Sequence, residues 1–288
     1  MLSGDKNNVF LIKKIAHNYY KIDSFPEVID YLKHAVRIYK SDVESLYLLS
    51  KAYEKSKNYE KSLEVSIVAL DIDSTQTNFL RQAGKACFQM KDYQNASDFF
   101  MQCYALNDTA LFVQKLFGIS NHRIDAHLAA EVLLKSAYNK DSTNFELSYF
   151  LGRTLKELRK YDESIKYLKK AYELIQPTTD NLIAYHVEMV IIQKQLKQYQ
   201  KMYKEYQTLY KLSKDPVYVY YMGSTAQYYL KNKELAFNHY ENYLKLTPDD
   251  ETQMDLGNTA EINISIRKVA QENYELLKKE RFFEGDLE

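Results

Sequence analysis

The sequence has few of the residues that mark turns, disulfides or tight ligand loops. Its 288 residues include only 7 Gly, 4 Pro and 2 Cys, and there is no Trp. So few Gly and Pro residues exclude an all-β sandwich, which needs a turn about every 8–12 residues. They also argue against a Gly-rich phosphate loop, because backbone N–H groups approach phosphate closely only where side chains are absent. Two Cys residues are too few for a disulfide framework.

The charge balance and the hydropathy of the sequence narrow the class of protein further. The chain balances 39 basic against 39 acidic residues, so it lacks the basic field of a nucleic-acid-binding protein. No apolar run approaches the ~20 residues that a membrane span needs. Residues 1–8 contain no apolar signal-peptide core. We therefore expect a cytoplasmic protein as the sequence is written, or a periplasmic or envelope-associated one if an N-terminal signal was removed.

The chain does contain a repeat with a period of 34 residues. Small side chains recur at that spacing at Ala16, Ser50, Gly84, Gly118 and Gly152. A second small series lies 19 residues after the first, at Ala35, Ala69, Cys103, Ala137 and Ala171. A series of ring-bearing residues lies nine after the first, at Phe25, Tyr59, Tyr93, His127 and Tyr161. Three registers agree, which indicates a repeat protein.

Each 34-residue unit has the pattern of two amphipathic helices. In the second unit, Leu46, Leu49 and Tyr53 fall on one helical stripe, and a polar turn follows it. Pro177 ends the second helix of the fifth unit, since proline has no N–H and forces the preceding residue to be extended. The small residues are expected where the two helices of a unit cross, because only small side chains fit there.

These features resemble the tetratricopeptide repeat family. Numbering each unit from 1 to 34, the family's positions 8, 20, 24 and 27 are filled in the fifth unit by Gly152, Ser164, Leu168 and Ala171. The resemblance implies an all-α, right-handed superhelix of about seven helix-turn-helix units. The units expected are 9–42, 43–76, 77–110, 111–144, 145–178, 183–216 and 217–250.

Two irregularities and two flanking segments complete this organisation. Four extra residues, 179–182, break the phase before the sixth unit, and the Met222-Gly223 pair of the seventh implies one inserted residue in its first helix or turn. Residues 1–8 are expected to be a lead. Residues 251–288 are expected to hold a capping helix and tail, because the last repeat of a solenoid has an uncovered apolar face.

The resemblance also implies where a partner would bind. Positions 2, 5, 9 and 12 of each first helix lie on one side of that helix, and in the family they line a concave groove. Over the first five units this stripe carries seven Lys or Arg and three Glu residues, a net charge of +4, with aromatic residues between them. The binding residues we predict are Lys13, His17, Tyr47, Lys51, Arg81, Lys85, Phe88, Lys115, Tyr149, Arg153, Lys156 and Tyr221.

The predicted function is a non-catalytic scaffold or adaptor that binds a peptide or protein segment, with an acidic segment favoured by the charge of the groove. The chaperone carboxylate clamp of the family is not predicted, because its Asn position holds His17. We expect no catalytic residues, cofactor, metal site or nucleic-acid partner. His122 and His127 lack ligand spacing, and Cys87 and Cys103 take packing positions. The alternatives are an envelope or periplasmic assembly scaffold, an RNA-binding helical repeat, and a regulatory part of an enzyme complex.

Overall fold

The computed structural model describes residues 7–175, 178–247 and 266–285, and these residues form helices and turns without a strand. Residues 1–6 of the predicted lead, residues 248–250 of the predicted seventh unit, and residues 251–265 and 286–288 of the predicted cap and tail lie outside the described residues, as does Pro177, the predicted end of the fifth unit. The helices are α1 (Val9–Lys21), α2 (Phe25–Ile38), α3 (Val43–Lys55), α4 (Tyr59–Ile72), α5 (Thr77–Gln89), α6 (Tyr93–Ala105), α7 (Leu111–Arg123), α8 (His127–Lys140), α9 (Phe145–Glu157), α10 (Tyr161–Leu174), α11 (Thr179–Gln195), α12 (Tyr199–Ser213), α13 (Val217–Tyr228), α14 (Lys233–Leu246) and α15 (Ile266–Gly285).

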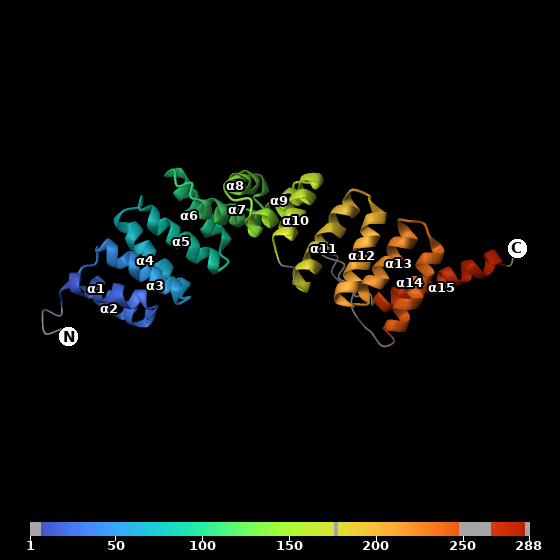
Figure 1. Ribbon diagram of the computed structural model, residues 1–288, viewed down its shortest axis with the longest axis horizontal. Coiled ribbons are helices and arrows are strands. Elements are labelled where there is room, and N and C mark those ends of the chain that lie inside the picture. Colours follow the sequence, from blue (N-terminus) through green and yellow to red (C-terminus); the bar gives the residue numbers. More distant parts are fainter. Residues whose placement is uncertain (1–6, 176–177, 248–265, 286–288) are drawn as a thin grey trace. The chain divides into compact units, whose positions relative to one another are not determined.

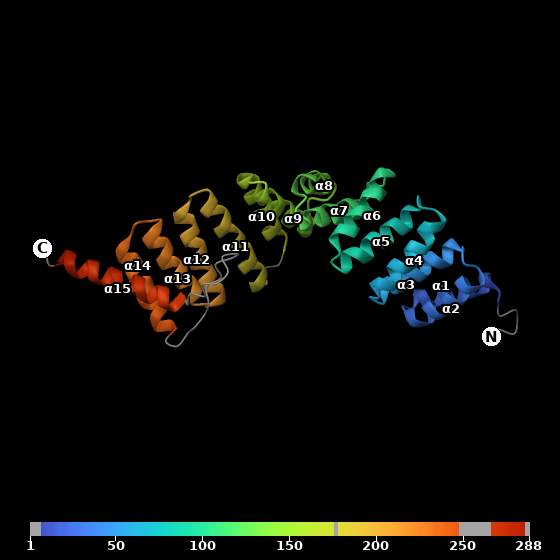
Figure 2. The same cartoon turned by 180° about the vertical axis from the view of Figure 1, so that it is seen from behind.

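The helices form two compact modules that divide between Tyr167 and Leu168. The N-terminal module contains α1 to α9 and the beginning of α10, and the C-terminal module contains the remainder. Within each module, helices that follow one another in sequence pack side by side, as α3, α4 and α5 do in one and α12, α13 and α14 in the other (Figure 1, and from behind in Figure 2). The predicted all-α repeat fold is confirmed.

The helix ends follow local capping signals. In five helices the residue before the helix is Asn or Asp, and its side chain accepts a hydrogen bond from a backbone N–H of the first turn. These caps are Asn8, Asn58, Asp92, Asn144 and Asn232. Such a bond satisfies one of the four backbone donors that a helix N-terminus leaves unpaired. Polar residues between the helices therefore fix the ends of the repeat units.

Small residues lie where the two helices of a repeat cross. A Cβ atom placed on Gly84 would be 2.8 Å from Cε1 of Phe100, and one on Gly118 would be 2.7 Å from Cγ of Leu134. Both neighbours are fully buried, so they have little room to move away. The recurring small position of the sequence is thus a close helix crossing.

The turn between the helices of each repeat has the same backbone. Its next-to-last residue has a positive φ of 55–63° in all seven turns, which is the left-handed region. None of these residues is glycine: they are Asp23, Lys57, Lys91, Asp125, Arg159, Lys197 and Lys231. L-residues adopt this conformation at some energetic cost, whereas glycine does so freely. Gly84 and Gly118 are instead placed at helix crossings.

The two irregularities of the sequence have simple structural forms. Residues 179–182 add a turn to the beginning of α11, which has 17 residues where the first helices of the N-terminal module have 13. In the seventh repeat the connection 229–232 has four residues, whereas 56–58 and 90–92 have three. Gly223 accordingly faces Tyr240 as Gly84 faces Phe100.

Helix α15 closes the C-terminal module. It packs on α14 and also reaches α13, as α5 packs on α4 and reaches α3. Ile266, Ala270, Asn273 and Leu277 form its buried stripe, and the Tyr228 hydroxyl donates a 2.9 Å hydrogen bond to Oδ1 of Asn273. Helix α15 therefore takes the place that the first helix of an eighth repeat would have.

Candidate functional site

The first-helix face of the N-terminal module consists of positions 2, 5, 9 and 12 of α1, α3, α5, α7 and α9. Helices α3, α5, α7 and α9 contact one another in turn, and Lys13 joins α1 to α3 by an ion pair with Glu44. The face brings together eleven of the twelve predicted binding residues: Lys13, His17, Tyr47, Lys51, Arg81, Lys85, Phe88, Lys115, Tyr149, Arg153 and Lys156. Tyr221 belongs to the C-terminal module.

Most cations of this face pair with carboxylates of the same or an adjacent repeat. Nζ of Lys13 lies 2.6 Å from Glu44, Nζ of Lys115 lies 2.6 Å from Glu146, and Nζ of Lys85 lies 2.7 Å from Glu54. The hydrogen bond to Glu44 raises the pKa of Lys13. Since these pairs join neighbouring repeats, they order the stack and leave less positive charge for a partner than the sequence suggests.

Arg81 makes the most enclosed of these pairs. Its guanidinium donates two hydrogen bonds to the carboxylate of Asp108, the one from Nη2 to Oδ1 being 2.6 Å long. Only 8% of Asp108 is exposed, and the hydrogen bond from Arg81 lowers its pKa. Paired hydrogen bonds from a planar guanidinium fix orientation as well as charge. Arg81 therefore has a structural role in the third repeat.

Lys51 and Arg153 lie over tyrosine rings. Nζ of Lys51 is 5.4 Å from the ring centre of Tyr20 and 5.5 Å from that of Tyr47. Cζ of Arg153 is 5.7 Å from the ring centre of Tyr149. Cation–π contacts hold a charge in place without neutralising it. Lys51 is thus a positioned positive charge on the face.

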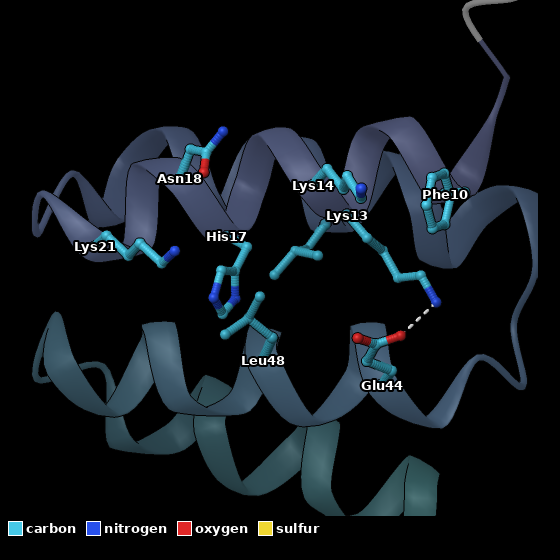
Figure 3. Close-up of a pocket in the computed structure, with 9 residues that line it drawn as sticks. Phe10, Lys13, Lys14, His17, Asn18, Lys21, Glu44 and Leu48 are labelled. Carbon is cyan, nitrogen blue, oxygen red and sulfur yellow. Dashed lines mark hydrogen bonds and ion pairs between the residues drawn. The ribbon is translucent and has the colours of Figure 1, made fainter.

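A hollow of about 410 Å³ opens between α1 and α3. Figure 3 shows His17 of α1 pointing towards Leu48 of α3, with Lys13 reaching across to Glu44. Lys14 and Lys21 also line the hollow, and Leu32 forms a fully buried part of its wall. Phe10, 64% exposed, borders it. The hollow combines apolar walls with four basic or histidine side chains and one carboxylate.

The sequence pattern does not mark Lys14, Lys21 or Leu48 as site residues, because they lie outside positions 2, 5, 9 and 12. A signal for the first two was available, since residues 9–21 contain three Lys and no acidic residue. Leu48 carries no such signal, because an apolar residue on an amphipathic helix is ordinarily part of the core.

Two of the predicted aromatic residues, Phe88 and Tyr221, pack against neighbouring rings. Phe88 makes an edge-to-face contact with Tyr93 at 5.5 Å between ring centres. Tyr221 is half-buried and stacks on Tyr206 of α12 at 5.4 Å, in a tyrosine cluster of the C-terminal module. Burial raises the pKa of both Tyr206 and Tyr221. Both rings are therefore part of the packing between α12 and α13.

His122, also on the face, is 6% exposed. Its Nδ1 lies 3.1 Å from Oγ1 of Thr154, which itself donates to the carbonyl of Phe150 at 2.7 Å. Thr154 therefore links the His122 ring to the backbone of α9. Desolvation, with Arg153 nearby, lowers the pKa of His122 to about 4, so this imidazole is neutral at pH 7.

The predicted thiols are buried, as expected. Cys87 and Cys103 are free and fully buried, and burial raises the pKa of Cys87 to about 11 and that of Cys103 to about 12. Over the described residues, no group of three His, Cys, Asp or Glu side chains is arranged to hold a metal ion. In the same part of the chain, no helix combines the length and apolar character needed to cross a membrane.

Comparisons with known proteins agree with the helical pattern. The tetratricopeptide repeat family model matches residues 43–76, 82–109 and 145–177. No curated protein sequence matches the chain. Among solved structures, MamA protein is 20% identical with a TM-score of 0.54, covering 58% of this chain and 91% of its own. Residues 41 to the end of MamA from Desulfovibrio magneticus RS-1 are also 20% identical, with a TM-score of 0.54, covering 59% of this chain and 96% of their own.

YrrB, described as a tetratricopeptide repeat protein with an unusual peptide-binding site, is 14% identical with a TM-score of 0.57, covering 62% of this chain and 93% of its own. At such identities the likeness concerns the fold, and it extends over little more than half of the chain.

Proposed function

Since this chain is a tetratricopeptide repeat protein, we propose that it is a non-catalytic interaction scaffold that binds a peptide segment of another protein on the first-helix face of its N-terminal module. The hollow between α1 and α3 is the observation that carries this proposal. It offers concave apolar surface next to a few polar groups, which is the usual composition of a binding site.

The charges around the hollow favour a segment with a carboxylate. Lys14, His17 and Lys21 line it, and Glu44, the acidic residue among its walls, is held by Lys13. Lys51 adds a positioned charge on the same face. The preference for an acidic segment is thus assigned to the first two repeats, because Arg81, Lys85 and Lys115 are occupied by carboxylates further along.

Selection from a displayed library of random peptides, followed by binding measurements, tests this function. We expect selected peptides to carry Asp or Glu beside an apolar residue and to bind the chain. His17→Glu and Lys51→Glu should each weaken binding about tenfold or more, as expected for the loss of an attractive contact and the gain of a repulsive one.

Lys33→Glu is the matched control, because Lys33 is an exposed lysine of α2 away from the hollow. The affinity of this variant for the selected peptides should equal that of the unaltered chain. Selected peptides that bind all three variants equally would show that the first-helix face is not the binding surface.

A further inference from the structure

Every internal repeat of the N-terminal module buries one side of its first helix against the preceding second helix. Positions 3, 7 and 10 of α3, α5, α7 and α9 are at most 9% exposed. They are Ser45, Leu49 and Ala52; Phe79, Ala83 and Ala86; Val113, Phe117 and Ser120; and Leu147, Leu151 and Thr154. Leu147 and Leu151, for example, share a core cluster with Ala130, Leu134 and Ala137 of α8. The fold thus places a second helix against this side.

Helix α15 shows the same stripe at the end of the C-terminal module. Its buried residues Ile266, Ala270, Asn273 and Leu277 are spaced by four, three and four residues. Ile266, Ala270 and Leu277 join Tyr240 and Tyr243 of α14 in one core cluster. The spacing is therefore that of a first helix lying on a second helix.

Helix α1 carries a stripe with this spacing that is left open. Leu11, Ile15, Asn18 and Ile22 are again spaced by four, three and four residues. Leu11 is 36% exposed, Ile15 is half-buried, Asn18 is exposed, and Ile22, the residue that follows the helix, is 71% exposed. Helix α1 uses other sides for its contacts within the module, since Ala16 packs on Val28 and Leu32 of α2 and Lys13 reaches Glu44 of α3. We call this stripe, Leu11, Ile15, Asn18 and Ile22, the open face.

The open face differs from an ordinary solvent-facing side of a helix. Such a side is usually polar, whereas three of the four residues here are Leu or Ile. An apolar stripe at helical spacing is complementary to the apolar stripe of another helix. In each internal repeat of this module a helix occupies the equivalent place.

Charge indicates which kind of helix fits. Residues 9–21 contain Lys13, Lys14 and Lys21 and no acidic residue. Lys14 and Lys21, seven residues apart, lie along one border of the open face, since at about 100° per residue both fall on the side next to Asn18. The symmetric arrangement of a second copy would set these lysines against their own equivalents, which is unfavourable. An occupant with acidic residues along that border is favoured.

We propose that the open face binds an amphipathic helix of a partner protein, with acidic residues beside its apolar stripe, in the place of a preceding second helix. Lys14, Asn18 and Lys21 also line the hollow, whereas Leu11, Ile15 and Ile22 belong to the open face alone. Asn18 would receive a polar partner at its centre, as Asn273 does from Tyr228.

The test uses the whole chain and a synthetic helical peptide of about 20 residues, with Leu at heptad spacing and Glu along the borders of the Leu stripe. Binding is measured by fluorescence anisotropy. We expect this peptide to bind and a matched peptide with Lys in place of Glu to bind at least about tenfold more weakly. Ile22→Asp should weaken binding of the Glu peptide by about tenfold or more.

Leu128→Asp is the matched control, because Leu128 is also 71% exposed and lies on α8. It should leave affinity unchanged, and the thermal unfolding of both variants should match that of the unaltered chain. Equal binding of the Glu peptide to Ile22→Asp, or equal binding of the two peptides, would overturn the proposal.

Two further measurements identify other occupants. Sedimentation of the free chain that shows a dimer, converted to a monomer by Ile22→Asp, would assign the face to a second copy and overturn the partner helix. Strong hydrogen-exchange protection of α1 that is lost when residues 1–6 are removed, with the Asn8 cap retained, would assign the face to the chain itself, with the same consequence. His17→Glu should leave binding of the helical peptide intact. A failure of peptide binding in the hollow can therefore be distinguished from a failure of helix binding on the open face.

Discussion

The hydroxyl of Ser164 donates a 2.8 Å hydrogen bond to the backbone carbonyl of Gly152 across the helix crossing of the fifth repeat. The second repeat repeats this relationship, with Ser62 donating to the carbonyl of Ser50 at 2.9 Å. Both hydroxyls are fully buried. In each case, a small residue allows two helices to approach closely enough for a side chain of one to reach the backbone of the other.

Replacing that serine tests the contribution of the bond. Ser164→Ala should lower the free energy of unfolding by about 1 kcal/mol, the usual net value of a buried hydrogen bond. Chemical denaturation provides the measurement. Ser142→Ala, at an exposed serine, should leave stability unchanged. An equal loss of stability in both variants would show that the hydrogen bond at the helix crossing is not the cause.

Glycine at the crossings can be tested by adding one methyl group. Gly84→Ala and Gly118→Ala should each destabilise by roughly 1–2 kcal/mol, because overpacking exceeds the gain in helix propensity. Gly223→Ala should be closer to neutral, since its Cβ would lie 3.1 Å from the Tyr240 ring. Thermal unfolding of the three variants gives the ranking. Adding Phe100→Leu to Gly84→Ala should cost less than the sum of the two changes, and strict additivity would contradict the clash.

The left-handed turns offer a route to higher stability. Lys57→Gly and Lys91→Gly should each raise the free energy of unfolding by up to about 1 kcal/mol, because glycine adopts positive φ without steric penalty. Lys33→Gly, in the middle of α2, should instead destabilise by about 1 kcal/mol. If all three variants lose stability alike, relief of strain in the turns is not significant.

His122 should make stability dependent on pH. Its folded-state pKa of about 4 lies below the ordinary value of 6.5, so the unfolded chain binds a proton that the folded chain does not. Stability is therefore retained above pH 6.5 and falls as the pH decreases from 6.5 towards 4, by on the order of 1–2 kcal/mol at pH 5. Denaturation at several pH values should show a smaller decrease for His122→Gln, and an unchanged pH dependence would contradict this origin.

The sequence alone determined the repeat and its helices. The period of 34 residues and the small residues can be read from the sequence, because residues with the same role recur at a fixed spacing. The first helices of the first five predicted units begin at 9, 43, 77, 111 and 145. The resemblance to the tetratricopeptide family followed from the same pattern, and so did the burial of Cys87 and Cys103.

Only the tertiary structure decided which charges of the first-helix face remain available. Lys13 and Glu44 are 31 residues apart, and Arg81 and Asp108 are 27 apart. The sequence pattern assigns each charge to a position on a single helix. Whether two charges form an ion pair depends on the distance between side chains of neighbouring repeats, because electrostatic energy decreases with distance. The hollow between α1 and α3 and the open face of α1 depend in the same way on which helix lies beside which.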